Sequence, residues 1–134
     1  MTGILLVSHG DFSKGILNTL NMKIGNTKQV FALSLEYDED FQQLIKKLQK
    51  LEKELEKFNR VLVFVDLIGG TPCNSAFFEY VNNPKYNIIS GMNLPMIIDA
   101  IVEDKDIEQI IETGRESIVN VKEYAANIKD EFDE

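Results

Sequence analysis

Long apolar runs, cysteine and histidine are scarce in this sequence of 134 residues. No stretch of about eighteen apolar residues occurs, so we expect no membrane-spanning helix. The amino terminus also lacks the basic, apolar and small-residue succession of a signal peptide. The single cysteine, Cys73, excludes an internal disulfide, and together with the one histidine it gives no cluster with metal-ligand spacing. These absences predict a cytoplasmic protein without a structural metal.

Positive charge is also in deficit, since 14 Lys and Arg residues stand against 22 Asp and Glu residues and the formal net charge is -8. Affinity for nucleic acid depends on clustered Lys and Arg, so we expect no nucleic-acid partner. We interpret the Glu-Lys mixture around residues 46–57 as a solvated helix face and about 128–134 as an acidic, frayed tail. The length predicts one domain over residues 1–134.

Short apolar runs alternate with helical patterns along the chain. The runs predict strands at residues 4–7, 30–35, 61–65 and 86–90. Apolar residues at helical spacing predict helices over about 12–24, 41–58, 71–81 and 94–102, and a last helix capped by Asp106. This alternation predicts an open, doubly wound α/β fold with a mostly parallel sheet and helices on both faces.

Two segments give more specific local signals. Thr71 followed by Pro72 predicts a helix start, because Thr can cap free amides and Pro fits the first helical position. Residues 117–124 are compatible with helix and equally with a short extra strand, which would add a fifth, antiparallel strand to the sheet.

A strand order of 2-1-3-4 places the ends of strands one and three side by side at the switch point, where ligands bind in such folds. His9 leaves the first strand, and Asp66 through Thr71 leave the third. A carboxylate that accepts a hydrogen bond from one imidazole nitrogen leaves the other as a nucleophile near neutral pH. The sequence therefore predicts that Asp66 orients His9 for covalent chemistry.

The residues that follow Asp66 suit an anion. Gly69, Gly70 and Thr71 directly precede a predicted helix, where free amides and the helix dipole favour negative charge. Phosphoryl transfer chiefly needs positioning and electrostatic stabilisation, so a histidine, a carboxylate and an amide cradle are sufficient without a cofactor. Taken singly, the histidine, the aspartate and the glycines are each equally compatible with a structural turn.

At these positions the chain resembles the enzyme IIA family of the mannose, fructose and sorbose phosphotransferase systems. Three stretches carry the resemblance: residues 4–10 (ILLVSHG), 65–74 (VDLIGGTPCN) and 90–96 (SGMNLPM). It implies that His9 accepts phosphate from the carrier protein HPr and passes it to an enzyme IIB. Sugar is phosphorylated later, during transport by membrane components that this chain reaches only through IIB.

The resemblance also implies roles at matching positions. Asp66 orients His9, Thr71 stands beside the phosphate, and Gly69 and Gly70 shape the loop. The expected walls of the crevice are Gly10, Gly91, Asn93 and Pro95. The family is homodimeric, and a short strand is sometimes exchanged between subunits, which would suit residues 117–124.

Two other functions remain open at this point. One is a regulatory domain whose phosphorylation controls a transcription activator, in which His9 is labelled but no IIB receives the phosphate. The other is a small-ligand binding module that uses the same crevice with a chemically silent histidine. The transported sugar cannot be inferred from this chain, because specificity in these systems resides in the membrane components.

Overall fold

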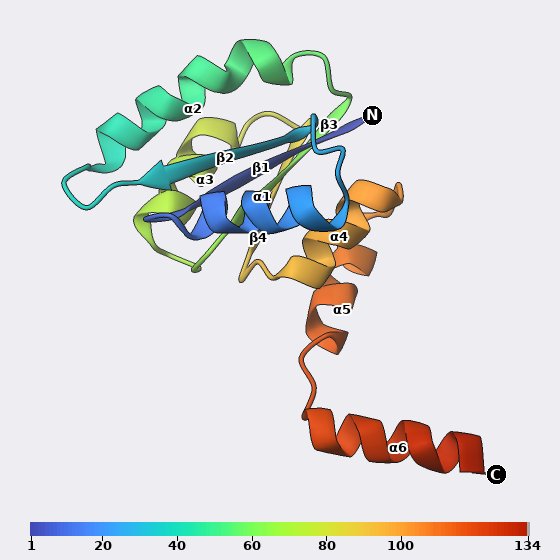
Figure 1. Cartoon of the computed structure of the whole chain (residues 1–134). Helices are drawn as coiled ribbons and strands as arrows, with labels where there is room; N and C mark the ends of the chain where they lie inside the picture. The colour runs from blue at the N-terminus through green and yellow to red at the C-terminus, as the bar shows by residue number, and fades with distance from the viewer. Residues whose placement is uncertain (134) are drawn as a thin grey trace.

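A computed structural model describes the backbone of residues 1–133 and the side chains of residues 1–129. Four parallel strands form one sheet in the order β2-β1-β3-β4, which confirms the predicted order (Figure 1). The strands are β1 (Thr2–His9), β2 (Val30–Leu35), β3 (Arg60–Val65) and β4 (Tyr86–Ser90). The helices are α1 (Phe12–Lys23), α2 (Phe41–Leu55), α3 (Thr71–Tyr80), α4 (Leu94–Val102), α5 (Ile107–Glu116) and α6 (Val121–Asp133).

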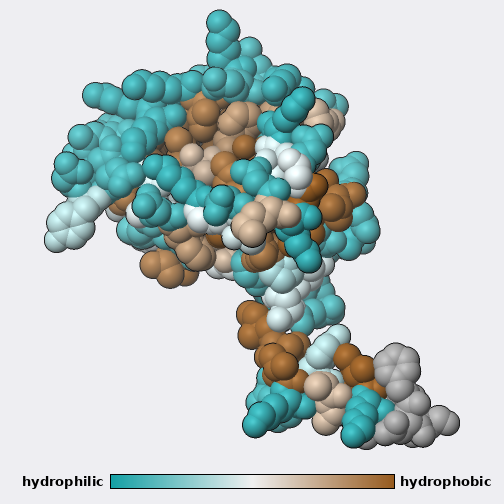
Figure 2. Space-filling model, in the orientation of Figure 1, coloured by the Kyte–Doolittle hydropathy of each residue, from teal (hydrophilic) through white to brown (hydrophobic). Residues whose placement is uncertain are grey.

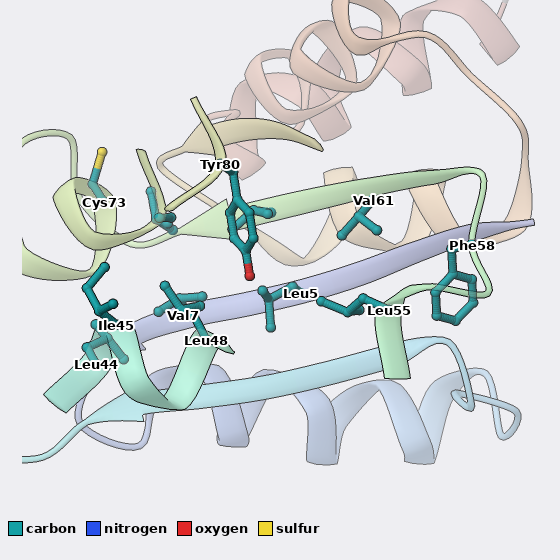
Figure 3. Close-up of a cluster of buried hydrophobic side chains, with 13 residues drawn as sticks. Leu5, Val7, Leu44, Ile45, Leu48, Leu55, Phe58, Val61, Cys73 and Tyr80 are labelled. Carbon is teal, nitrogen blue, oxygen red and sulfur yellow. The ribbon is translucent and has the colours of Figure 1, made fainter. Parts of the chain in front are cut away.

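The two central strands are buried on both faces. Along β1, Leu5 and Val7 pack on one side while Ile4 and Leu6 pack on the other, as the two-residue repeat of a strand requires. One face is covered by α2 and α3, and Figure 3 shows the side chains that fill that layer. The other face is covered by α1, α4 and α5. The doubly wound arrangement is therefore confirmed.

Helix α2 shows how local sequence sets one of these elements. Its N-cap, Asp40, accepts a hydrogen bond from the N–H of Gln43, and the Gln43 side chain accepts one from the N–H of Asp40. This capping box satisfies two amides that a helix start leaves free. The apolar residues three and four apart then turn towards the sheet, and these are Leu44, Ile45, Leu48 and Leu55.

Residues 117–124 follow the helical alternative only in part, because residues 118–120 form a loop and a helix begins at Val121. The helix over residues 107–116 ends before Ile118, and a separate helix, α6, begins at Val121. Asn120 starts α6, because its side chain accepts a hydrogen bond from the N–H of Glu123 and its carbonyl oxygen accepts one from Tyr124. Within residues 1–133 the sheet has four strands, and no fifth strand is present among them.

Helix α6 stands away from the rest of the molecule (Figure 1). Hydrophobic side chains cluster between the end of α5 and the start of α6 (Figure 2). Among them, Ile118, Val121 and Tyr124 are all exposed. The acidic end, expected to be a frayed tail, continues this helix as far as Asp133, and Glu134 lies outside the described residues. None of the helices within residues 1–133 combines the length and the apolar character that crossing a membrane requires.

Candidate functional site

The ends of β1 and β3 bring His9 and Asp66 together. The two strands are paired up to Val7 and Val65, so the next residues of both emerge at the same edge of the sheet. Oδ2 of Asp66 lies 2.8 Å from the backbone nitrogen of His9 and 2.8 Å from its ring nitrogen Nδ1. Oδ1 of the same carboxylate accepts a hydrogen bond from the N–H of Leu67 at 2.9 Å. One carboxylate thus binds three donors.

These hydrogen bonds keep Asp66 charged. Burial of the carboxyl raises its pKa, but the hydrogen bonds from the His9 N–H, the His9 ring and the Leu67 N–H outweigh burial and lower the pKa below its ordinary value. An ionised carboxylate can only accept hydrogen bonds, so Nδ1 of His9 carries a proton, and in the neutral ring Nε2 keeps its lone pair. The His9 side chain is 47% exposed while that of Asp66 is 12% exposed, which leaves the ring accessible to a reactant.

The amino end of α3 lies against the His9 ring. Gly69 has a φ of +79°, in the region that favours glycine. Gly70 is the N-cap of α3, and a Cβ atom at this position would lie 2.9 Å from Cε1 and 3.6 Å from Nε2 of His9. Only a residue without a side chain therefore allows the helix end to approach the imidazole this closely.

The start of α3 corrects the expected capping. Thr71 was predicted as the cap and Pro72 as the first helical residue, but Gly70 is the cap and Thr71 begins the helix. The close contact with His9 requires glycine at the cap position. Pro72 still fits in the first helical turn, because residues there have no helical acceptor for an N–H, so the N–H that proline lacks is not missed. Free amides and the helix dipole at this end favour an anion beside Nε2.

Asn74 holds the glycine loop and was given no role from the sequence. Its side-chain nitrogen donates to the carbonyl oxygen of Gly69 at 3.0 Å, and its N–H donates to the carbonyl oxygen of Gly70 at 2.8 Å. The sequence held a signal for this role, since an Asn placed four or five residues after a turn can donate hydrogen bonds to the carbonyl oxygens of that turn. The signal was not specific, because many other residue types are compatible with a helix at this position.

The remaining predicted residues lie in two places. Gly10, with a φ of +55°, turns the chain directly after His9 and donates its N–H to the carbonyl oxygen of Leu35 at 2.8 Å. Gly91 and Asn93 lie beyond β4, where Asn93 caps α4 through the N–H of Met96 and donates to the carbonyl oxygen of Gly114. Pro95 is an exposed residue in the first turn of α4.

Apolar surface adjoins the histidine. Leu67 is 60% exposed and Ile68 is 81% exposed in the loop that leaves β3. On the other side, a hollow of about 560 Å³ between α1 and the start of α4 is lined by Phe12, Gly15, Ile16, Thr19, Met92, Asn93 and Leu94. The described residues contain no group of three or more His, Cys, Asp and Glu side chains that could hold a metal ion.

Replacing Gly70 by alanine tests the contact between α3 and the ring. We expect Gly70→Ala to displace the imidazole and to slow any reaction at Nε2 by about 10- to 100-fold, since small misplacements of a reacting group are costly. The kinetics of modification at Nε2, followed by intact-mass spectrometry, would measure this effect. Gly15→Ala is the matched control, because no atom lies within 4 Å of a Cβ built there. Equal rates for the two variants would contradict the contact.

The lowered pKa of Asp66 predicts an acid-sensitive contribution to stability. A carboxyl group whose pKa is depressed by folding stabilises the protein above its ordinary pKa of 3.8, and this contribution is lost as the pH falls through the lowered value. Native protein should therefore keep its stability advantage over Asp66→Asn from about pH 7 down to about pH 4, and should lose this advantage as the pH falls further. Urea unfolding of both proteins at a series of pH values measures this, and a constant difference would contradict the prediction.

Taken together, the fold and the site define an open α/β domain whose one histidine is hydrogen-bonded to a carboxylate at the switch point of the sheet. A family model described as the PTS system fructose IIA component matches residues 3–115. The chain belongs to this family of phosphotransferase-system IIA components. Relatives in this family are named as components of sugar phosphotransferase systems.

Individual relatives agree with this assignment. The chain is 29% identical over 126 residues to the PTS system mannose-specific EIIAB component of Escherichia coli strain K12. This alignment covers 89% of this chain but only 39% of the relative's length. It is 27% identical over 101 residues to the PTS system fructose-specific EIIA component of Bacillus subtilis strain 168, covering 75% of this chain and 69% of the relative.

A solved structure is also similar. The PTS IIA protein associated with the fucose utilization operon from Streptococcus pneumoniae superimposes with a TM-score of 0.86 at 32% sequence identity. The match covers 92% of this chain and 96% of that one. The same fold therefore extends over most of both proteins.

Proposed function

We propose that this protein is a phosphoryl carrier in which His9 accepts phosphate from phospho-HPr and donates it to an enzyme IIB, for coupled sugar uptake and phosphorylation. The observation that supports this most is the 2.8 Å hydrogen bond between Nδ1 of His9 and Asp66, which leaves Nε2 as the free nucleophile. The protein would work in the cytoplasm without a cofactor. It would reach the membrane components only through IIB.

The accepting step needs only groups of this chain and of the donor. The lone pair on Nε2 of His9 attacks the phosphorus of the phosphohistidine of HPr, and a new N–P bond forms on His9. The N–P bond of the donor breaks, and its electron pair returns to the donor imidazole. The proton on Nδ1 stays in place, and the negative charge of Asp66 offsets the positive charge that develops on the ring.

The amino end of α3 would stabilise the phosphoryl oxygens during both transfers. Gly70 and Thr71 begin this helix next to the ring, where the dipole attracts negative charge without movement of the protein. In the donating step, a nucleophile of IIB attacks the same phosphorus and neutral His9 leaves. The exposed side chains of Phe12, Leu67 and Ile68 offer both partners an apolar contact beside the reacting nitrogen.

The test is intact-mass spectrometry after incubation with enzyme I, HPr and phosphoenolpyruvate. We expect one added phosphoryl group that is labile in acid and stable in base, as a phosphorylated histidine is. Addition of a IIB protein should then remove it from this chain. Absence of the added mass with several competent donors would refute the proposal, and a label that no IIB removes would favour a regulatory domain instead.

We further propose that the protein acts as a homodimer. Ile118, Val121 and Tyr124 expose apolar surface around the start of α6, and a second copy of the chain would remove this surface from water. The arrangement differs from an exchanged strand, because residues 121–133 are helical.

A charge placed in this surface should prevent dimer formation. We expect Val121→Lys to shift the protein from dimer to monomer, because an apolar contact would be replaced by a charge that must lose its water. Light scattering coupled to size-exclusion chromatography measures the mass directly. Glu123→Lys, two residues further along the same helix, is the matched control and should leave the dimer intact. A native protein that is monomeric at every concentration would contradict the proposal.

A further inference from the structure

Two buried serines hold the turn that carries His9. Ser8 and Ser13 are both fully buried, although serine is mostly a surface residue. The hydroxyl of Ser8 accepts a hydrogen bond from the N–H of Ser13 at 2.8 Å and donates one to the carbonyl oxygen of Gly10 at 3.2 Å. A single hydroxyl group therefore joins the end of β1 to the start of α1 around His9.

The Ser8 hydroxyl caps the amino end of α1. The N-cap residue of α1 is Asp11, and its side chain makes no capping hydrogen bond among the described residues. Such a side chain ordinarily accepts from the second or third helical N–H. Ser13 is the second residue of α1, and its N–H is bound by Ser8 instead. The start of α1 is thus fixed to the strand that presents His9.

Ser13 extends this network to the neighbouring strand. Its hydroxyl donates to the carbonyl oxygen of Leu33 in β2 at 2.7 Å. On the opposite side, the backbone N–H of His9 is bound to Asp66 beyond β3. The turn is therefore held from both neighbouring strands, and a buried network whose donors and acceptors are satisfied specifies one geometry.

We infer that Ser8 and Ser13 are positioning residues for His9, which fix the turn so that Nδ1 faces Asp66 and Nε2 faces the reactant. Neither serine touches the reacting atoms, and both act through the backbone of the turn. The inference rests on the proposed function, since the benefit of a fixed imidazole is faster phosphoryl transfer, a reaction that depends chiefly on placement.

The first test compares three variants for their rate of phosphoryl transfer from phospho-HPr. We expect Ser8→Ala to slow transfer by about 10- to 100-fold, and Ser8→Thr, which keeps the hydroxyl, to restore most of the rate. Ser34→Ala is the matched control. Ser34 pairs with Ser8 in the β1–β2 register and is also buried, but its hydroxyl has no hydrogen-bond partner among the described residues, so its removal should leave the rate unchanged.

The second test needs no phosphate. Because His9 is the only histidine, nitrogen NMR of the imidazole reports one residue without ambiguity. Ser8→Ala should lower the fraction of the tautomer protonated at Nδ1, whereas Ser34→Ala should not. A variant that only melts earlier, with unchanged rate and unchanged nitrogen signals, would overturn the inference. If Ser8→Ala does not fold, Ser13→Ala decides the question with the same two measurements.

The two proposals fail in different ways. A native chain that takes up no phosphate contradicts the proposed function, and the nitrogen signals of the serine variants still decide the positioning role. A native chain that is phosphorylated, with a Ser8→Ala variant of native rate and native signals, retains the function and refutes the positioning role.

Discussion

His9→Ala should take up no phosphate at all, whereas the native chain takes up one phosphoryl group per molecule. The variant lacks the only imidazole in the sequence, so no second histidine can replace it. The fold should survive, because the His9 side chain is half exposed and makes its one side-chain hydrogen bond to Asp66. Intact-mass spectrometry after incubation with enzyme I, HPr and phosphoenolpyruvate measures uptake directly.

Two controls make this result decisive. Circular dichroism of His9→Ala should match that of the native protein, which separates a lost acceptor from a lost fold. Cys73→Ser removes the other intrinsically strong nucleophile and should still take up phosphate, since Cys73 is buried in α3. Uptake of phosphate by His9→Ala would place the acceptor on another residue and would refute the carrier role of His9.

Asp66→Asn should slow phosphoryl transfer by about 100-fold or more, on the scale of other catalytic histidines that lose their orienting carboxylate. The carboxylate accepts hydrogen bonds from three N–H groups, those of the His9 backbone, the His9 ring and Leu67. An amide has only one acceptor oxygen, so in either orientation its NH₂ group faces an N–H donor. When the NH₂ group replaces Oδ2, it faces the His9 ring, which then turns or changes tautomer, and Nε2 no longer keeps its free lone pair. When it replaces Oδ1, it faces the Leu67 N–H, and in both orientations the negative charge that offsets the developing charge of the ring is lost.

The kinetics of labelling by phospho-HPr would measure this loss, and nitrogen NMR of His9 would show the change of tautomer. Asp11→Asn is the matched control, because it removes the same charge two residues after His9 from an exposed side chain that makes no capping hydrogen bond among the described residues. An Asp66→Asn variant that transfers phosphate at the native rate would remove Asp66 from the mechanism.

The strand order and the meeting of His9 with Asp66 could be predicted because both follow from regular geometry. Continuous apolar runs mark strands buried on both faces, and parallel strands in the order 2-1-3-4 end at one edge. The residue that follows each of the two central strands is then placed without knowledge of any side-chain contact. Prediction worked where position in the sheet alone decided the outcome.

The exact start of α3 and the capping of α1 by Ser8 could not be predicted, because both depend on contacts between segments. Thr71 and Pro72 gave a correct local signal for a helix start, but the contact of Gly70 with the His9 ring decided which residue became the cap. Likewise, Asp11 is a good N-cap by residue type, yet Ser8 binds the amide of Ser13. Local preference is weaker than a tertiary contact at such positions.

The carboxyl-terminal segment shows a different limit to prediction. Residues 117–124 contain β-branched residues that suit a strand, while Asn120 followed by Glu123 suits the start of a helix. The hydrogen bond from the Glu123 N–H to Asn120 decides for the helix in this chain. A strand at these residues would need the edge of a sheet with which its backbone N–H and C=O groups could pair. The sequence of one chain does not reveal whether such a partner is present.

The close approach of Gly70 to the imidazole also constrains the order of events in a complete reaction. With the helix end against Cε1 and the carboxylate at Nδ1, two sides of the ring are occupied, and a reactant reaches Nε2 through the half of the side chain that remains exposed to solvent. Donor and acceptor proteins must use this same approach, so they would exclude each other. Turnover would then follow ping-pong kinetics, in which the first carrier departs before the second one binds.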